Sequence, residues 1–440
     1  MAAPHKSENI PQARGVHTPD PLAPEGSRLR LDSVDVLRGI VMVVMALDHV
    51  RDYLTHLSFQ PEDVPHTYFA LWITRWVTHY CAPSFFFLAG TGAFLSYARG
   101  KSKAQIAHFL WTRGLWLILL EFTVVGFGWT FIFPFPWGGV LWALGWSMVI
   151  NSAIVRLPTK WIVAIGAVMV AGHNLLDNVQ PAAFGKLGWL WTILHQPGFI
   201  PLTPPAWLQP HLPPGAPFGF FVLYPLVPWI GVMALGFAFG EVLRRTPADR
   251  QRWTLRAGLI VTAAFIVLRA TNIYGNPHQN FFAGTGLPDA DFHLQATLAN
   301  DFILFTDVAK YPPSLQFLLM TLGPALIALS FFDRIRISGP GLAARVARFF
   351  VVFGRVPMFY YVLHLYVIHL MAIAVASAFG QPHAHLWRGG FMLGSAPPGF
   401  GFNLPFIYLM WIAVVLVLYY PCLWLMRLKQ RRRDWWLSYM

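Results

Sequence analysis

The sequence predicts an all-α fold, a polytopic membrane helix bundle of about ten transmembrane helices. Of the 440 residues, 56% are hydrophobic and only 12% are charged, whereas charged residues make up about a quarter of a typical soluble domain. Apolar runs of about 20 residues recur along the chain, and a run of that length crosses a hydrocarbon core about 30 Å thick. Lys and Arg gather in alternate connections between these runs. We therefore expect spans at residues 34–53, 69–97, 106–132, 139–155, 161–176, 218–240, 257–270, 312–332, 350–378 and 403–426.

The distribution of basic residues predicts the topology. If the N-terminus is cytoplasmic, 23 of the 32 Lys and Arg fall in cytoplasmic segments, and the outer loops hold only Arg51, Lys186, Lys310 and Arg388. This bias follows the positive-inside rule and places both termini in the cytoplasm. The net charge of +13 is then explained by topology and by contact with anionic lipid in the bilayer. We expect no nucleic-acid partner.

One membrane domain accounts for most of the chain. Residues 1–27 are polar and contain prolines, which predicts a disordered cytoplasmic tail. Residues 28–430 form the transmembrane domain, and 431–440 form a short basic cytoplasmic tail. Two outer loops, 177–217 and 271–311, are long enough to be functional. The first contains GKLGWLWTILHQPGF, whose pattern suggests a short helix lying in the membrane interface.

Ionisable side chains inside the predicted spans are the main indication of function. A charge at the centre of a bilayer costs about 2.5–3.5 kcal/mol or more, so such groups normally face a protein interior or a wet cavity. In the first span, Arg38, Met42, Met45, His49 and Asp52 recur every three or four residues and so share one helical face. With the predicted topology, Arg38 lies at the cytoplasmic end and His49 lies toward the outside.

Three other predicted spans carry titratable groups at central or outer depth. These groups are His79 with Arg75 one turn away on the second span, Glu121 on the third, and His364 with Tyr360 and Tyr361 within one turn on the ninth. A neutral imidazole is the least costly of these groups to bury, and it is a proton acceptor. That chemistry suits a general base acting on an amine or hydroxyl nucleophile.

Structural explanations compete with this one. His369 and His108 are interpreted as hydrogen-bonded core residues. For Arg38, anchoring the helix at the inner lipid headgroups explains the residue as well as a functional role does. Glu121 is interpreted as a partner for an Arg on another helix. His383 and His385, in QPHAHLW, have a spacing seen in metal sites. Because no third ligand is in view, they are interpreted as loop residues and no metal is expected.

Four segments in order resemble bacterial members of the heparan-α-glucosaminide N-acetyltransferase-like family. They are SVDVLRGIVMVVMALDH, APSFFFLAGTGAF, KYPPSLQFLLMTLGP and GRVPMFYYVLHLYVIH. The resemblance implies transfer of an acetyl group from cytoplasmic acetyl-CoA to a sugar across the bacterial inner membrane, through a histidine reached from outside. At the position of the family's working histidine this sequence has Phe69, with His66 three residues away. Arg38 and His49 also fit the Arg-x10-His pattern of bacterial membrane O-acyltransferases.

The site hypothesis follows from these residues and resemblances. The catalytic candidates are His49, ranked first, His79, ranked second, and His66, ranked third, with Asp48, Tyr361 and His364. The side chains expected to bind acyl-CoA, the co-substrate, are Arg38, Arg75, Arg99 and Arg355. Asp48 and Asp52 are expected to orient the histidine, and Tyr361 or Arg75 to stabilise the thioester oxyanion. A carbohydrate acceptor would lie against the outer loops.

Two alternatives remain, and the oligomeric state is open. Protonatable residues at mid-depth are also typical of proton-coupled small-molecule transporters. The second alternative is a membrane scaffold without catalytic activity. The acceptor, the acyl chain length and a homo-oligomeric state are not decided by the sequence.

Overall fold

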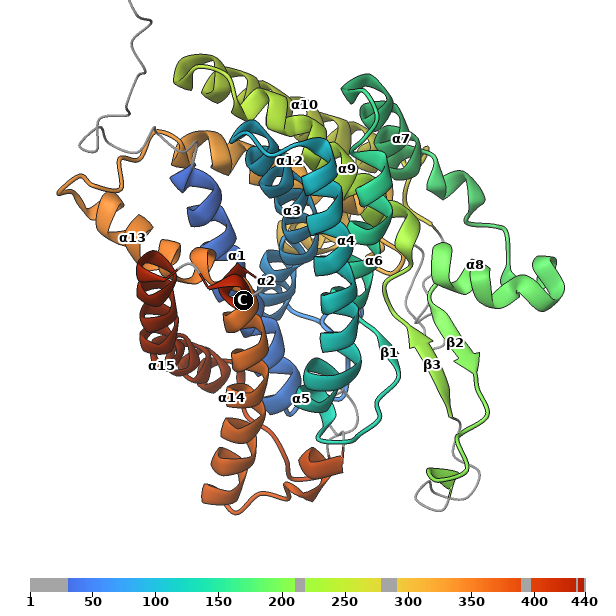
Figure 1. The fold of residues 1–440 in the computed structure, drawn as a ribbon. Helices are drawn as coiled ribbons and strands as arrows, with labels where there is room; N and C mark the ends of the chain where they lie inside the picture. Colours follow the sequence, from blue (N-terminus) through green and yellow to red (C-terminus); the bar gives the residue numbers. More distant parts are fainter. Residues whose placement is uncertain (1–30, 210–217, 278–290, 389–396, 433, 439–440) are drawn as a thin grey trace, which may run out of the picture.

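The structure, a computed structural model, describes residues 31–209, 218–277, 291–388, 397–432 and 434–438. It is a helical bundle (Figure 1), which confirms the predicted all-α class. The expected N-terminal tail, 1–27, lies outside the described residues, as do parts of both long outer loops. The helices are α1 Asp32–Leu54, α2 Phe69–His79, α3 Cys81–Ala98, α4 Lys103–Leu120, a π-helical turn Glu121–Val125, α5 Gly126–Thr130, α6 Val140–Ile154, α7 Thr159–Ala171, α8 Gly188–Leu194, α9 Leu226–Leu243, α10 Pro247–Thr271, α11 Leu298–Thr306, α12 Leu315–Phe332, α13 Leu342–Arg355, α14 Pro357–Ala378 and α15 Leu404–Arg431.

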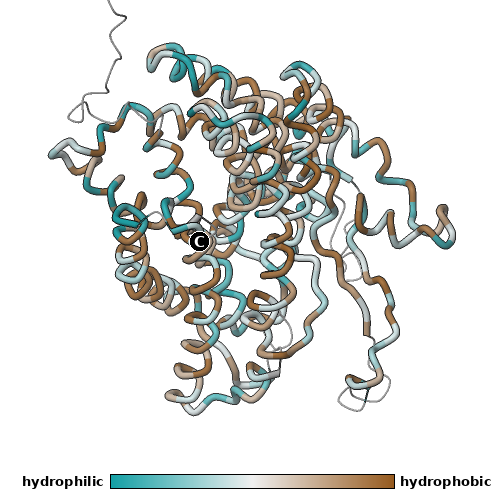
Figure 2. Tube along the Cα trace, viewed as in Figure 1, coloured by the Kyte–Doolittle hydropathy of each residue, from teal (hydrophilic) through white to brown (hydrophobic). Residues whose placement is uncertain are grey.

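The helices have the length and apolar character that a bilayer requires. In the described residues, 7 helical segments are long and apolar enough to cross a membrane, and α6 and α7 are apolar but shorter. The helix α1 has the length but carries Asp and Arg side chains near both of its ends. Figure 2 shows mostly hydrophobic helices, with hydrophilic residues collected toward the upper edge of the view. Each of the ten predicted runs corresponds to a helix, while the number that cross and the side of each terminus stay predictions.

Several of the predicted spans have different boundaries in the structure, and two of them show the physical reason. The run 218–240 begins with a short strand, and α9 starts only at Leu226, after Pro225. The run 350–378 is divided at Val356 into α13 and α14. A proline restricts the residue before it and cannot donate its backbone nitrogen, so Pro357 starts a new helix and prevents α13 from continuing.

A small sheet lies beside the helices. Its strands are β1 Trp137–Gly138, β2 Gly198–Pro201 and β3 Gly219–Val222, in the order β1-β3-β2. The strand β3 runs parallel to β1 and antiparallel to β2, with Phe199 opposite Phe221. The helix expected within GKLGWLWTILHQPGF is confirmed as α8, and its position in the membrane interface stays a prediction.

The first helix is the central element of the bundle. It contacts α13, α14 and α15 on one side and α2, α3 and α12 on the other (Figure 1). Most of its side chains are buried, including polar residues near both ends. At Gly39, a Cβ atom would overlap the backbone oxygen of Phe350, and at Gly354 it would overlap the backbone oxygen of Asp35. The two helices α1 and α13 therefore touch backbone to backbone at this point.

Replacing Gly39 by alanine is expected to destabilise the protein by about 1–3 kcal/mol, because the added methyl group has no space and forces α1 away from α13. Thermal unfolding of the purified protein in lipid nanodiscs measures the effect. The matched control is Gly92→Ala on α3, where a Cβ meets nothing within 4 Å. Equal melting temperatures for the two variants would show that the close contact between α1 and α13 does not contribute to stability.

Candidate active site

Two histidines from distant parts of the chain meet near the C-terminal end of α1. The Nδ1 atom of His49 lies 2.7 Å from the Nε2 atom of His364 on α14. The rings stack with their centroids 4.9 Å apart, and the indole of Trp129 on α5 meets the His49 ring edge-on at 4.6 Å. His364 is fully buried, whereas His49 is half-buried.

The hydrogen bonds of this pair define which nitrogen of His49 holds a lone pair. The Nδ1 atom of His364 lies 3.0 Å from the backbone oxygen of Tyr360. A carbonyl oxygen only accepts, so His364 Nδ1 carries the hydrogen and, in the neutral ring, Nε2 is an acceptor. His49 must then donate from Nδ1, which leaves its Nε2 atom unprotonated. The Tyr360 carbonyl thus fixes the tautomer of His49 through His364.

Aromatic side chains enclose this pair. The Tyr360 ring stacks on His364 at 5.3 Å, and the Tyr361 ring lies 5.4 Å from it. The hydroxyl of Tyr361 accepts a hydrogen bond from the Trp129 indole, so its own hydrogen stays available for donation. The predicted cluster of Tyr360, Tyr361 and His364 is therefore present, and α1 adds His49 to it.

On α1 directly before His49, a network of charged side chains surrounds Asp48. Its carboxylate accepts from Arg51 on the same helix, from Arg75 on α2 at 2.8 Å and from the Thr78 hydroxyl at 3.1 Å. Arg51 also donates to Thr74 at 3.0 Å and is only 1% exposed. Because unpaired charges are costly in a protein interior, these groups stabilise one another as a set. These bonds hold Asp48 to two arginines and a threonine, whereas the hydrogen bond at His49 Nδ1 is made with His364. The role of Asp48 in orienting the histidine stays a prediction.

The loop between α1 and α2 joins this network. Arg75 donates to Glu62 at 2.5 Å, which ties the loop to α2. Asp307, which follows α11, interacts electrostatically with both Arg75 and Glu62. Burial raises the pKa of Asp307 to about 7, and the Glu62 carboxylate pushes that pKa the same way, while Arg269 and Arg75 oppose the shift. Asp307 is therefore less fully ionised at neutral pH than an ordinary aspartate.

The other histidine candidates lie apart from this pair. His79 is 1% exposed, its ring is enclosed by Trp72 and Phe317, and neither of its nitrogens has a hydrogen-bond partner among the described residues. His66 lies on the exposed loop before α2 and bonds Asp63 at 2.9 Å. The prediction that His369 is a hydrogen-bonded core residue is confirmed, because its ring nitrogens bond the backbone oxygens of Gly128 and Leu386. The same prediction for His108 is wrong, because His108 is exposed.

Glu121 has a partner that differs from the predicted arginine. Its carboxylate accepts from the backbone nitrogen of Leu141 at 3.0 Å, in the first turn of α6. The first backbone N–H groups of a helix lack partners within the helix, and a carboxylate placed there satisfies them. Glu121 thus caps α6, from the start of the π-helical turn that follows α4.

The predicted donor-binding arginines lie in different places. Arg38 bonds Asp35 at 3.4 Å and the backbone oxygen of Gly354 at 3.1 Å. Arg355 bonds the same Asp35 at 3.4 Å and also Asp32 at 3.2 Å. Both therefore join α1 to α13 near the N-terminal end of α1. Arg75 belongs to the Asp48 network, and Arg99 is exposed at the end of α3, where it donates to Ser96.

Several residues of the site were missed by the sequence analysis. Arg51 was placed in an outer loop, although its spacing of three from Asp48 is typical of a helical ion pair. Trp129, Glu62, Thr74 and Thr78 were not singled out, because no local pattern marks them. Among the described residues, no group of three or more His, Cys, Asp or Glu side chains is arranged to hold a metal ion.

The helices of membrane-spanning length and the family match together place the chain in the class of membrane-embedded acetyltransferases. The catalytic family described as heparan-alpha-glucosaminide N-acetyltransferase matches residues 30–275, which is more than half of the chain. The chain belongs to this family and is an enzyme, so the resemblance to this family is confirmed, while the fit of Arg38 and His49 to the O-acyltransferase pattern stays a prediction. The match includes α1 with His49 but ends before α14 and His364. A search of curated proteins returns no match to the chain.

Proposed function

We propose that this enzyme transfers an acetyl or other acyl group from cytoplasmic acyl-CoA to an amine or hydroxyl group of an extracytoplasmic glycan, in the inner membrane of a bacterium. The observation that carries the proposal is the hydrogen-bonded pair of His49 and His364, which leaves Nε2 of the half-buried His49 unprotonated. An acetyltransferase needs a base of this kind for its nucleophile. Membership in the family favours the enzyme over the transporter alternative.

The proposed reaction uses this pair to move one proton. His49 Nε2 takes the proton from the acceptor as the acceptor's nitrogen or oxygen attacks the thioester carbonyl carbon. The positive charge that develops on His49 is stabilised by its Nδ1–H bond to His364. When the carbon–sulfur bond breaks, the leaving CoA thiolate recovers the proton from His49. The products are the acylated acceptor and free CoA, and the histidine pair returns to its starting state.

Tyr361 is the proposed donor to the oxyanion. Its hydroxyl accepts from Trp129 and keeps one hydrogen to donate. Preorganised donors of this kind account for a large part of the rate in acyl transfer. Arg75, the other candidate, already donates to Asp48 and Glu62, so it is better suited to holding the network in place.

The test uses inside-out membrane vesicles, whose outer surface is the cytoplasmic face. Labelled acetyl-CoA is added outside, and amine- or hydroxyl-bearing oligosaccharides are loaded into the lumen. We expect label on the luminal sugar, and none in vesicles from cells that lack the protein. If label reaches a sugar only when donor and sugar are on the same side, transfer across the membrane is ruled out. If label stays on CoA for every sugar, the glycan acceptor is wrong.

A further inference from the structure

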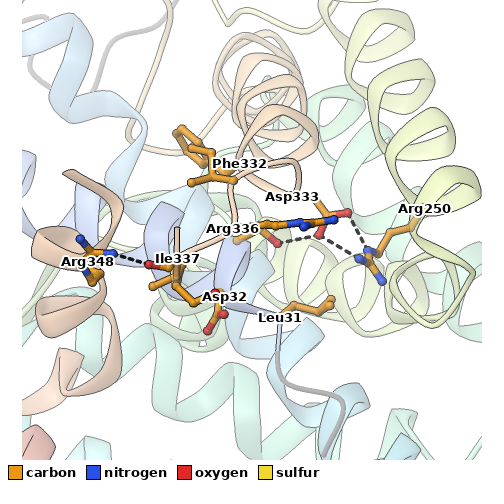
Figure 3. Close-up of a pocket in the computed structure, with 11 residues that line it drawn as sticks. Leu31, Asp32, Arg250, Phe332, Asp333, Arg336, Ile337 and Arg348 are labelled. Carbon is orange, nitrogen blue, oxygen red and sulfur yellow. Dashed lines mark hydrogen bonds and ion pairs between the residues drawn. The ribbon is translucent and has the colours of Figure 1, made fainter. Parts of the chain in front are cut away.

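A pocket lies at the N-terminal end of α1, away from the histidines. Its volume is about 580 Å³. The residues that line it come from the start of α1, from α10 and α13, and above all from the end of α12 and the turn after it (Figure 3). That turn and α13 lie outside the part of the chain that matches the family. The pocket is thus formed where the matched part of the chain, which supplies the start of α1 and Arg250, meets the unmatched part.

Three arginines surround the pocket, and two of them are held by the protein itself. Arg250 makes two bonds to Asp333, at 2.9 and 3.0 Å. Arg348 donates to the backbone oxygens of Ile337 and Gly339, and so holds the turn after α12. Arg336 is exposed, and its side chain has no hydrogen bond or ion pair with any described residue. Its guanidinium is the one among the three that is ready to bind an external anion.

The charge and shape of the lining favour a phosphate group. Asp32 and Asp333 offset two of the three arginines, so the lining keeps a net positive charge. A guanidinium presents a planar fork of donors that matches a phosphate in two-point geometry. Phe332, Ile335 and Ile337 add half-buried apolar surface beside these charges. A ligand with a phosphate and an apolar or flat portion fits this combination.

The position of the pocket relates it to the histidine pair. Asp32 lines the pocket, and His49 lies about 25 Å further along α1 at the helical rise per residue. Asp32 also bonds Arg355 at 3.2 Å, which places the pocket next to the contact between α1 and α13. With the predicted topology, the pocket opens toward the cytoplasm at the level of the inner headgroups. It therefore lies at the end of α1 from which the acyl donor would enter.

We propose that this pocket binds a phosphate group through Arg336, with Arg250 and Arg348 holding its walls in place. The proposal rests on the proposed function in one respect, since the source we expect is the phosphate-bearing nucleotide end of the acyl-CoA donor. The headgroup of an anionic lipid carries the same chemistry and is the second source. Both sources require the Arg336 side chain.

The first experimental arm measures binding without turnover. The full-length protein in nanodiscs of zwitterionic lipid is titrated with CoA, with CoA that lacks its 3′-phosphate and with pantetheine, which has no phosphate. We expect Arg336→Gln to weaken CoA binding about tenfold and to leave pantetheine binding unchanged. The matched control is Arg345→Gln, an exposed arginine on α13 that does not line the pocket. It should bind CoA as the unmodified protein does.

The second arm adds anionic lipid to the nanodiscs and measures the melting temperature. If Arg336→Gln abolishes a stabilisation by anionic lipid while CoA binding stays normal, the phosphate site is supported and its source is the lipid. If Arg336→Gln behaves like Arg345→Gln in both arms, the proposal is overturned. Transfer activity is scored separately. If transfer is normal and Arg336→Gln changes neither CoA binding nor lipid stabilisation, only the phosphate-site proposal is wrong. If CoA binding depends on Arg336 but no transfer is measured, only the proposed function is wrong.

Discussion

Replacing His49 by alanine is expected to reduce kcat by about 10²- to 10⁴-fold, the usual contribution of a general base. His49 Nε2 holds the lone pair of the histidine pair that the bond between the two rings does not use, and His49 is half-buried. Removing the imidazole leaves no acceptor for the nucleophile's proton at this position. The measurement is the rate of acetyl transfer by purified protein at saturating acetyl-CoA, with CoA binding determined in parallel to confirm that the donor site is intact.

Two variants separate this role from the alternatives. His364→Gln keeps His49 but removes the group that fixes its tautomer, so kcat should fall by less than in His49→Ala and the pH profile of kcat should shift. His79→Ala should mainly lower the melting temperature, because His79 is enclosed by Trp72 and Phe317. If His79→Ala abolishes transfer while His49→Ala remains active, the base is His79 and the assignment made here is wrong.

Replacing Asp48 by alanine is expected to destabilise the protein by about 3–5 kcal/mol, the usual cost of removing one partner from a buried ion pair. Asp48 is the acceptor shared by Arg51, Arg75 and Thr78. Without it, Arg51, which is 1% exposed, and Arg75, which is 9% exposed, lose the negative charge that they share. Thermal and denaturant unfolding in nanodiscs should both show the loss.

An exposed ion pair provides the control for this variant. Asp434 lies 4.0 Å from Arg432, and both side chains are largely exposed. A pair of this kind contributes about 0–1 kcal/mol, so Asp434→Ala should change the melting temperature little. The melting temperature of Asp48→Asn should lie between those of Asp48→Ala and Asp434→Ala, because an amide can still bond Thr78 but cannot neutralise the arginines. A melting temperature for Asp48→Ala equal to that of Asp434→Ala would show that the network does not hold α1 and α2 together.

The sequence predicted the features that depend on local pattern. Composition and run length predicted the helical membrane bundle, and the spacing of three and four residues placed Arg38 and His49 on the same helix. The same periodicity placed Tyr360 and Tyr361 beside His364, as the ring contacts show. These relations lie within one helix, where the rise and turn per residue fix the geometry.

Relations between helices could not be predicted in this way. His49 and His364 are 315 residues apart, and no periodicity shows which face of α14 meets α1. For the same reason Asp48 was paired with its neighbour in the sequence, although its partners include Arg75 and Thr78 on another helix. The boundary between α13 and α14 was missed because the apolar run continues through Val356 and only Pro357 interrupts it. Burial of Arg51 likewise depends on neighbours supplied by α2.

The hydrogen-bond chain from His49 ends at the backbone oxygen of Tyr360, and an amide oxygen has no affinity for a proton at physiological pH. A proton that enters at His49 therefore has no onward route through this chain and must leave by the atom at which it arrived. In the proposed reaction each cycle would return that proton to the departing CoA thiolate, so the exchange of an acyl group for a hydrogen would move no net charge between the two compartments. The acyl group would cross without coupling to the electrochemical gradient, so the free energy of the thioester alone would drive the modification.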